Sequence, residues 1–308
     1  MNFGPLIFLG VLATFVASWW GLVFAPQLQI GSQQPAQVDA GIYPTRRLGL
    51  AEQGREVYVA NGCVHCHSQQ VQQDSYTFDV VLLSGGTNAP DAVAKVIERV
   101  APGVNAKEVL AKASQQSPQP LLSNVTQTVA ADVQKALKAT GAVAQAVFIP
   151  LGPDIARQWG TRRTVAADYL YDYPVQVGNS RLGSDLSNVG ARTPAADWHL
   201  HHLYNPRTVV PGSIMPAYQY LFETRPVGKK RSPQALTLAE KFAHKKPGVD
   251  LEVVPTSEAL QLVAYLQSLR VDNALFEAPS TQLAPPAAVA GTNAPVATNA
   301  PAAANAPK

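Results

Sequence analysis

The sequence predicts a mainly α protein that has a transmembrane helix at its N-terminus and a small α+β insert in its middle. Three observations lead to this prediction. An uncharged apolar run covers residues 3–25, apolar side chains recur at helical spacing in 257–269, and residues 76–150 alternate between strand-like and helix-like patterns. The expected units are an anchor at 1–26, a helical domain made of 27–75 and 151–278, the insert at 76–150, and an Ala/Pro/Asn-rich disordered tail at 279–308.

The apolar run at the N-terminus is long enough to span a membrane. Phe3 to Ala25 contains 23 residues and no charge. At ~1.5 Å per residue such a helix spans the ~30 Å hydrocarbon core of a lipid bilayer. The alternative is a cleaved signal peptide, because residues 23–25 resemble a small-residue cleavage site. Pro26 directly after that site, the absence of basic residues before the run and the length of the run favour a retained anchor.

Residues 63–67 read Cys-Val-His-Cys-His and contain both cysteines of the chain. Two thiols on one helical turn can form thioethers with the two vinyl groups of a porphyrin, and the adjacent His67 can bind its iron. Cys-x-x-Cys-His is the local signature of this attachment, so Cys63, Cys66 and His67 predict one covalent haem c. Zinc would need further ligands. A thioredoxin-like pair would follow a strand, whereas residues 51–60 have a helical pattern. Both alternatives stay open.

The insert begins within about ten residues of this motif. Its pattern predicts strands at 77–83, 121–125 and 144–149 and helices at 89–100, 106–113 and 130–140. In order and in several short stretches, this segment resembles the C-terminal domain of the bacterial ribosomal stalk protein. The resemblance implies a packing or partner-binding module, and the alternative is a loop filler without its own activity.

Met215 is the only methionine besides Met1, and it lies in a loop between Pro211 and Pro216. A methionine usually fills a hydrophobic core. A lone methionine in a rigid loop instead indicates the second axial ligand of an iron. A thioether opposite His67 favours the ferrous state and suits electron transfer.

The order of these features resembles that of class I cytochromes c. Gly54 and Tyr58 share one face of the helix before the motif, and residues 257–269 form a second amphipathic helix that Thr256 or Ser257 can cap. The resemblance implies a class I cytochrome c domain in which these two helices cross near the haem edge.

Residues 181–192 are similar to the family's Gly-Pro-x-Leu…Gly-x-Arg segment, whose proline carbonyl accepts a hydrogen bond from the proximal histidine. Ser184 stands in place of that proline, and its carbonyl can serve equally, although the turn is less rigid. By the same resemblance, Arg192, Trp198 and Ser213 lie near the haem propionates and His202 lies near the Met215 sulfur.

Further segments are absent from ordinary cytochromes c. They are residues 69–71 (Gln-Gln-Val), 154–163 (Asp-Ile-Ala-Arg-Gln-Trp-Gly-Thr-Arg-Arg), 168–175 (Asp-Tyr-Leu-Tyr-Asp-Tyr-Pro-Val) and 198–206 (Trp-His-Leu-His-His-Leu-Tyr-Asn-Pro). These segments resemble subunit II of cbb3-type cytochrome c oxidases, over about residues 1–75 and 150–275. That subunit is a membrane-anchored cytochrome with a single haem.

The resemblance implies a non-catalytic electron-transfer subunit of a respiratory oxidase. Its partners would be c-type cytochrome donors, a haem–copper catalytic subunit and the bacterial inner membrane, with residues 27–308 in the periplasm. The alternatives are the mono-haem subunit of a nitric oxide reductase and a free-standing anchored electron shuttle. The net charge of +3 over 308 residues gives no indication of nucleic-acid binding.

Overall fold

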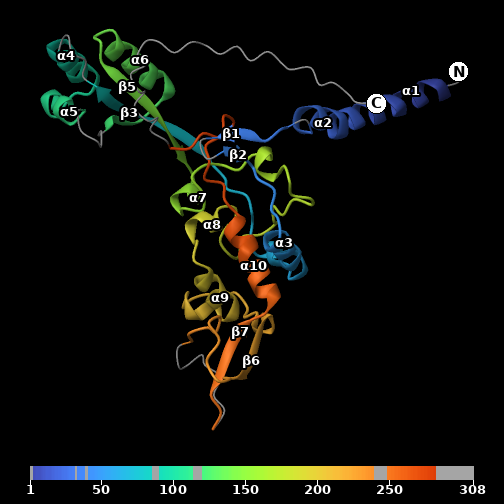
Figure 1. Ribbon diagram of the computed structural model, residues 1–308. Helices are drawn as coiled ribbons and strands as arrows, with labels where there is room; N and C mark the ends of the chain where they lie inside the picture. Colours follow the sequence, from blue (N-terminus) through green and yellow to red (C-terminus); the bar gives the residue numbers. More distant parts are fainter. Residues whose placement is uncertain are drawn as a thin grey trace, which may run out of the picture.

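The computed structural model describes residues 3–31, 33–38, 41–84, 90–113, 120–238 and 248–281 (Figure 1). Within these ranges, helices and three small sheets give a mixed α/β structure rather than the mainly α one that the sequence predicted. The unpredicted strands are β1 (Ala36–Val38), β2 (Gly41–Tyr43), β6 (Phe222–Pro226) and β7 (Leu251–Pro255). Strands this short show too few residues for an alternating pattern to be recognised. Of the predicted tail, residues 282–308 lie outside the described ranges.

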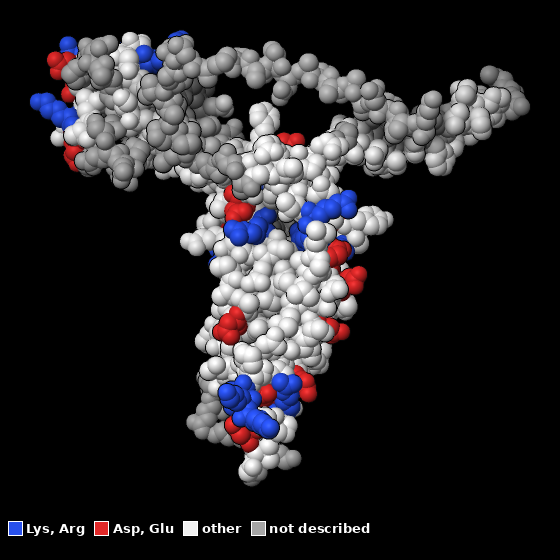
Figure 2. Space-filling model, in the orientation of Figure 1, with Lys and Arg blue, Asp and Glu red and all other residues white. Residues whose placement is uncertain are grey.

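The N-terminal helix is longer than the sequence indicated. The helices α1 (Gly4–Trp19) and α2 (Ala25–Ile30), joined by a π-helical turn at Trp20–Phe24, form one 27-residue helix with a mean hydropathy of 2.1. Its length and composition suit a membrane span, and Figure 2 shows no blue or red along it. It continues past Pro26, where the anchor was expected to end. Proline disrupts an α-helical turn, and the wider turn, in which Ala25 N–H bonds the Trp20 carbonyl, accommodates it.

The helices on either side of the motif pack closely against each other (Figure 1). They are α3 (Leu50–Ala60) and α10 (Ser257–Ser268). Gly54 permits the approach, because a Cβ atom there would lie 1.8 Å from the Gln261 carbonyl oxygen. One turn further on, the rings of Tyr58 and Tyr265 lie 5.2 Å apart between centroids. The prediction that Gly54 and Tyr58 share a packing face is therefore confirmed.

Replacing Gly54 by alanine should lower the free energy of unfolding by about 3 kcal/mol, at the upper end of the usual cost of overpacking. The added methyl would meet backbone atoms of α10, which cannot rotate away as a side chain can. Chemical denaturation followed by circular dichroism measures the change. Glu56→Ala is the control, since Glu56 is exposed on the same helix. Equal stability of the two variants would show that the helices do not make this contact.

The core of this part of the chain includes two shorter helices, α8 (Val189–Arg192) and α9 (Ala196–Tyr204), which contact α10. Buried apolar side chains from these helices, from α3 and α10 and from the antiparallel strands β6 and β7 form one continuous cluster. Cys63 and Met215 are partly buried and pack against this same cluster, although they are 152 positions apart in the chain. The predicted attachment turn and the predicted methionine ligand therefore pack against the same hydrophobic core.

The segment from 75 to 151 forms a three-stranded antiparallel sheet with three helices, in the order predicted from the sequence. Its elements are β3 (Ser75–Ser84), α4 (Pro90–Val100), α5 (Ala106–Ala113), β4 (Pro120–Val125), α6 (Gln127–Lys138) and β5 (Val143–Leu151). It has a hydrophobic cluster of its own, in which Val80 and Leu82 of β3 meet Ile97 and Leu137. The largest difference between a predicted and an observed boundary is at the start of α6. This helix begins at Gln127, three residues before the predicted start, because Thr126 caps it.

The two long strands of this segment explain how the chain closes across it. β3 and β5 pair from Ser75 opposite Leu151 to Ser84 opposite Val143. At the base of this ribbon, Asp74 N–H donates to the Leu151 carbonyl at 2.9 Å. Just before it, Gln72 N–H donates to Asp154 Oδ2 at 2.8 Å. The chain therefore enters and leaves the insert at the same place. The residues just before the insert bond directly to those just after it.

Candidate haem-attachment site

The two cysteines lie on one tight turn that follows α3. Gly62 has a φ of +63°, a left-handed conformation that ends the helix and favours glycine. A 3₁₀ turn over Cys63–His65 follows, and His67 N–H donates to the Cys63 carbonyl at 3.0 Å. Both thiols are free, with Cys63 partly buried and Cys66 exposed. Burial raises the pKa of the Cys63 thiol to about 11. The predicted helical turn is confirmed, and the thiols are available for attachment.

His67 is held in one orientation by a backbone carbonyl. Its Nδ1 lies 2.8 Å from the Ser184 carbonyl oxygen, the contact predicted for the residue that replaces proline. A carbonyl only accepts, so Nδ1 carries the proton and Nε2 keeps a free lone pair. Burial lowers the pKa of His67, which keeps the imidazole neutral. A neutral ring with a fixed tautomer is the form that binds a metal ion.

Gly183 lets the Ser184 loop approach the ring. A Cβ at position 183 would lie 2.2 Å from His67 Cε1 and 2.7 Å from Nε2. The loop is also pinned by two backbone hydrogen bonds, from Gly183 N–H to the Cys66 carbonyl at 2.9 Å and from Leu186 N–H to the Ser68 carbonyl at 2.8 Å. A side chain at 183 would therefore have to displace either the loop or the imidazole.

We expect Gly183→Ala to disturb His67 without removing its chemistry. The loop or the ring must shift by about 1 Å to reach van der Waals distance, so the axial bond should lengthen or break. In haem-loaded protein, this would appear as a mixture of high-spin and low-spin ferric absorption and electron paramagnetic resonance signals. Gly212→Ala is the control, because a Cβ there would meet no atom within 4 Å. Identical spectra for wild type and Gly183→Ala would rule out this packing.

Asp185 organises the backbone on the His67 side of the site, a role that the sequence analysis did not assign. It is fully buried. Oδ2 accepts from Ser68 Oγ at 2.6 Å and from Gln70 N–H at 2.7 Å, and Oδ1 accepts from Ser187 N–H at 2.8 Å. Arg181 Nε donates to the same Ser68 hydroxyl at 3.1 Å. A single aspartate in a loop has no sequence pattern that would reveal this network.

Arg192 and His202 each have a buried polar atom without a partner among the described residues. Arg192 Nη2 donates to the Asp185 carbonyl at 2.9 Å, whereas its buried Nη1 has no partner among the described residues. His202 stacks on Trp198 with ring centroids 4.7 Å apart, and its buried Nδ1 also lacks a described partner. Burial, with smaller contributions from His67 and His199, lowers the pKa of His202 to about 4. An unpartnered guanidinium nitrogen suits a propionate, so Arg192 fits a haem at this position.

The Met215 loop is fixed to the same core. Tyr218 N–H donates to the Leu203 carbonyl of α9 at 2.8 Å, and Met215 N–H donates to Ser213 Oγ at 3.2 Å. Ser213 therefore stabilises the turn that presents Met215. Contacts of Ser213 and Trp198 with propionates, and of His202 with the Met215 sulfur, stay predictions.

A buried ion pair connects residues 162–168 with Tyr43 of β2 and with Asn273, which follows α10. Arg162 and Asp168 are joined by two parallel hydrogen bonds of 2.7 and 3.0 Å. Tyr43 donates to Asp168 Oδ1 at 2.7 Å, and Arg162 Nε donates to the Asn273 carbonyl at 2.5 Å. Burial, then the Asp168 charge, raises the pKa of Tyr43, so its phenol stays protonated as a donor. Arg162 and Asp168 both lie in segments that resemble the oxidase subunit, but no role was predicted for either of them.

Together these contacts define a class of site: two thiols and a neutral imidazole on one turn, with a thioether in the same core and an unpartnered arginine nitrogen nearby. A family model described as cytochrome c oxidase, mono-heme subunit/FixO, matches residues 145–243. The match includes Arg192 and Met215 but begins after the 63–67 motif and does not cover it. It supports, at the level of the family, a mono-haem subunit of a cbb3-type oxidase that acts in electron transport. No curated protein sequence matches the chain.

Proposed function

We propose that this chain is the membrane-anchored mono-haem cytochrome c subunit of a cbb3-type cytochrome c oxidase. In this role it passes single electrons from c-type cytochrome donors towards the haem–copper catalytic subunit. The observation that carries the proposal is the contact between His67 Nδ1 and the Ser184 carbonyl, directly after two free thiols. That contact leaves Nε2 free on the histidine that the attachment motif assigns to iron.

In the proposed site, Cys63 and Cys66 attach one haem c, and His67 and Met215 are its axial ligands. The bound haem supplies a reversible one-electron couple. The protein holds the imidazole neutral and oriented, supplies a thioether that favours the ferrous state, and offers Arg192 Nη1 to a propionate. The apolar cluster behind Cys63 and Met215 excludes water from this side of the site. The chain makes and breaks no substrate bond in this role.

The proposed location follows from the anchor and from the attachment chemistry. The helix from Gly4 to Ile30 would cross the bacterial inner membrane once, with residues 27–308 in the periplasm. Residues 27–75 and 151–278 would form the cytochrome c domain. Residues 76–150 would be an inserted module, similar to the ribosomal stalk C-terminal domain, that packs on or binds a partner. Its separate hydrophobic cluster and the meeting of its two ends at the base of β3 and β5 support this division.

Copurification tests the proposed role. The full chain, tagged and extracted from membranes in mild detergent, should bring with it a subunit containing haem b and copper, and the complex should consume oxygen. A partner containing haem b and non-haem iron that reduces nitric oxide would assign the chain to a nitric oxide reductase instead. A cytochrome that purifies without partners under these conditions would indicate a free-standing shuttle.

A further inference from the structure

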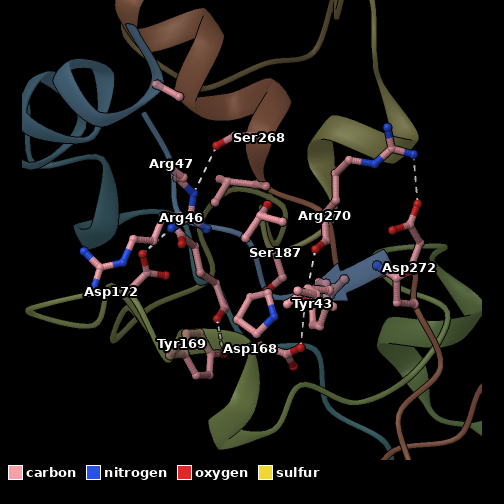
Figure 3. Close-up of a pocket in the computed structure, with 18 of the residues that line it drawn as sticks. Tyr43, Arg46, Arg47, Asp168, Tyr169, Asp172, Ser187, Ser268, Arg270 and Asp272 are labelled. Atoms are coloured by element: carbon pink, nitrogen blue, oxygen red, sulfur yellow. Dashed lines mark hydrogen bonds and ion pairs between the residues drawn. The ribbon is translucent and has the colours of Figure 1, made fainter. Parts of the chain in front are cut away.

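A cavity of about 460 Å³ lies between the segment that follows the anchor and the end of α10 (Figure 3). Its walls come from three stretches of the chain and some single residues: 42–48, 168–169 and 268–273, with Val38, Ala51, Gln69, Asp172 and Ser187. A cavity of this size falls in the usual range for small ligands. It begins eight residues after Ile30, the last residue of the anchor helix, so it belongs to the part of the chain next to the membrane.

The charges around this cavity leave one arginine without an ion pair. Six charged residues line the walls: Arg46, Arg47, Arg270, Asp168, Asp172 and Asp272. Each aspartate already has an ion pair, Asp168 with buried Arg162, Asp172 with Arg47 and Asp272 with Arg270. Arg46 is exposed, has no ion pair among the described residues, and lies 4.9 Å above the ring of Tyr171. When Arg162 behind the wall is counted with the six lining residues, four arginines face three aspartates, and the arginine left without an ion pair in the described ranges is Arg46.

A buried hydroxyl supplies a second free polar group. Ser187 is a lining residue that is only 4% exposed, and its buried Oγ has no hydrogen-bond partner among the described residues. Three other hydroxyls in the walls are occupied, since Tyr43 donates to Asp168, Tyr169 to the Gln69 carbonyl and Ser268 to the Tyr265 carbonyl. A buried hydroxyl without a partner is costly unless a ligand or water completes its bonding.

The rim of the cavity is apolar. Ile42 and Leu48, both lining residues, are 62% and 79% exposed. They stand on either side of Arg46 in sequence and follow an uncharged helix that is exposed along its length. Exposed aliphatic side chains beside an arginine match the boundary between acyl chains and phosphate groups in a bilayer.

We propose that this cavity binds a phosphate-bearing anion, and that the source of the phosphate is the headgroup of an anionic phospholipid. The Arg46 guanidinium would pair with a phosphodiester oxygen, Ser187 Oγ would donate a hydrogen bond to the headgroup, and Ile42 and Leu48 would contact the acyl chains. Arginine forms strong paired hydrogen bonds with phosphate. The site would fix the distance and tilt of the cytochrome relative to the membrane.

Lipid retention tests this proposal with the full chain. Wild-type protein in nanodiscs of phosphatidylcholine with or without phosphatidylglycerol is returned to detergent, and the retained lipid is counted by native mass spectrometry. We expect about one phosphatidylglycerol per chain, and an approximately tenfold loss of retention in Arg46→Gln, the effect of one charge-assisted contact. Ser187→Ala should lose less. Arg99→Gln, at an exposed position on α4, is the matched control and should retain lipid as wild type does.

The remaining outcomes are decisive as well. Equal retention in Arg46→Gln and wild type would overturn the proposal. If inorganic phosphate binds in an Arg46-dependent manner while phosphatidylglycerol is not retained, the site takes phosphate but the lipid assignment is wrong. If a segment of another polypeptide fills the cavity in the purified complex, the lipid assignment also fails. None of these results depends on haem content or electron transfer, so they can be distinguished from failure of the proposed function.

Discussion

Replacing Arg162 by methionine should lower the free energy of unfolding by about 3–5 kcal/mol, the usual cost of leaving one member of a buried ion pair without its partner. Both side chains of the Arg162–Asp168 pair are almost completely buried. The substitution would leave the Asp168 carboxylate inside the protein with only Tyr43 and a backbone N–H to stabilise it. For a chain of this size the melting temperature should fall by roughly 6–20 °C, as measured by circular dichroism or calorimetry.

Two further variants separate this explanation from a general loss of packing. Arg231→Met removes a half-exposed partner of Asp250 and should change stability by at most about 1 kcal/mol. Adding Asp168→Asn to Arg162→Met removes the unpaired charge and keeps an oxygen for Tyr43, so part of the stability should return. If Arg162→Met costs no more than Arg231→Met, the buried pair does not support the fold as described.

Replacing Met215 by alanine should remove the sulfur-to-iron absorption band near the red end of the ferric spectrum while covalent haem is retained. A thioether ligand favours ferrous iron, so the reduction potential should also fall. We expect a fall of more than ~59 mV, which corresponds to a tenfold change in a one-electron equilibrium. Optical spectra recorded during a redox titration measure both quantities in one experiment.

Ile214→Ala is the matched control for this substitution. Ile214 precedes Met215 in the same loop, and its side chain is exposed. The control should therefore keep both the band and the potential of the wild type. A ferric band that survives in Met215→Ala would show that another side chain binds the iron opposite His67.

Local sequence patterns were sufficient for the features that depend on neighbours in the chain. The elements from 75 to 151, the turn at 63–67 and the packing face of Gly54 and Tyr58 all follow from periodicity, capping and short spacing. The Ser184 contact with His67 was also predicted, because the acceptor is a backbone carbonyl that any residue supplies.

Features that depend on distant residues could not be predicted in this way. Tyr43 lies 125 positions from Asp168 in sequence, and Asn273 lies 111 positions from Arg162. Nothing in a single sequence indicates that such residues meet. The helix through Pro26 was missed for a different reason, since a π-helical turn that absorbs a proline has no recognisable sequence pattern. The short strands of the two-stranded sheets were missed because three to five residues are too few to show an alternating pattern.

The central claim is that Cys63, Cys66 and His67 hold one covalent haem c. The most direct test is a pyridine haemochrome spectrum of the purified full chain after extraction with acidified acetone, which removes haem that is not covalently attached. We predict a c-type spectrum that corresponds to one haem per chain, and its loss in the variant that combines Cys63→Ala with Cys66→Ala. A wild-type chain that retains no haem after extraction would contradict the claim.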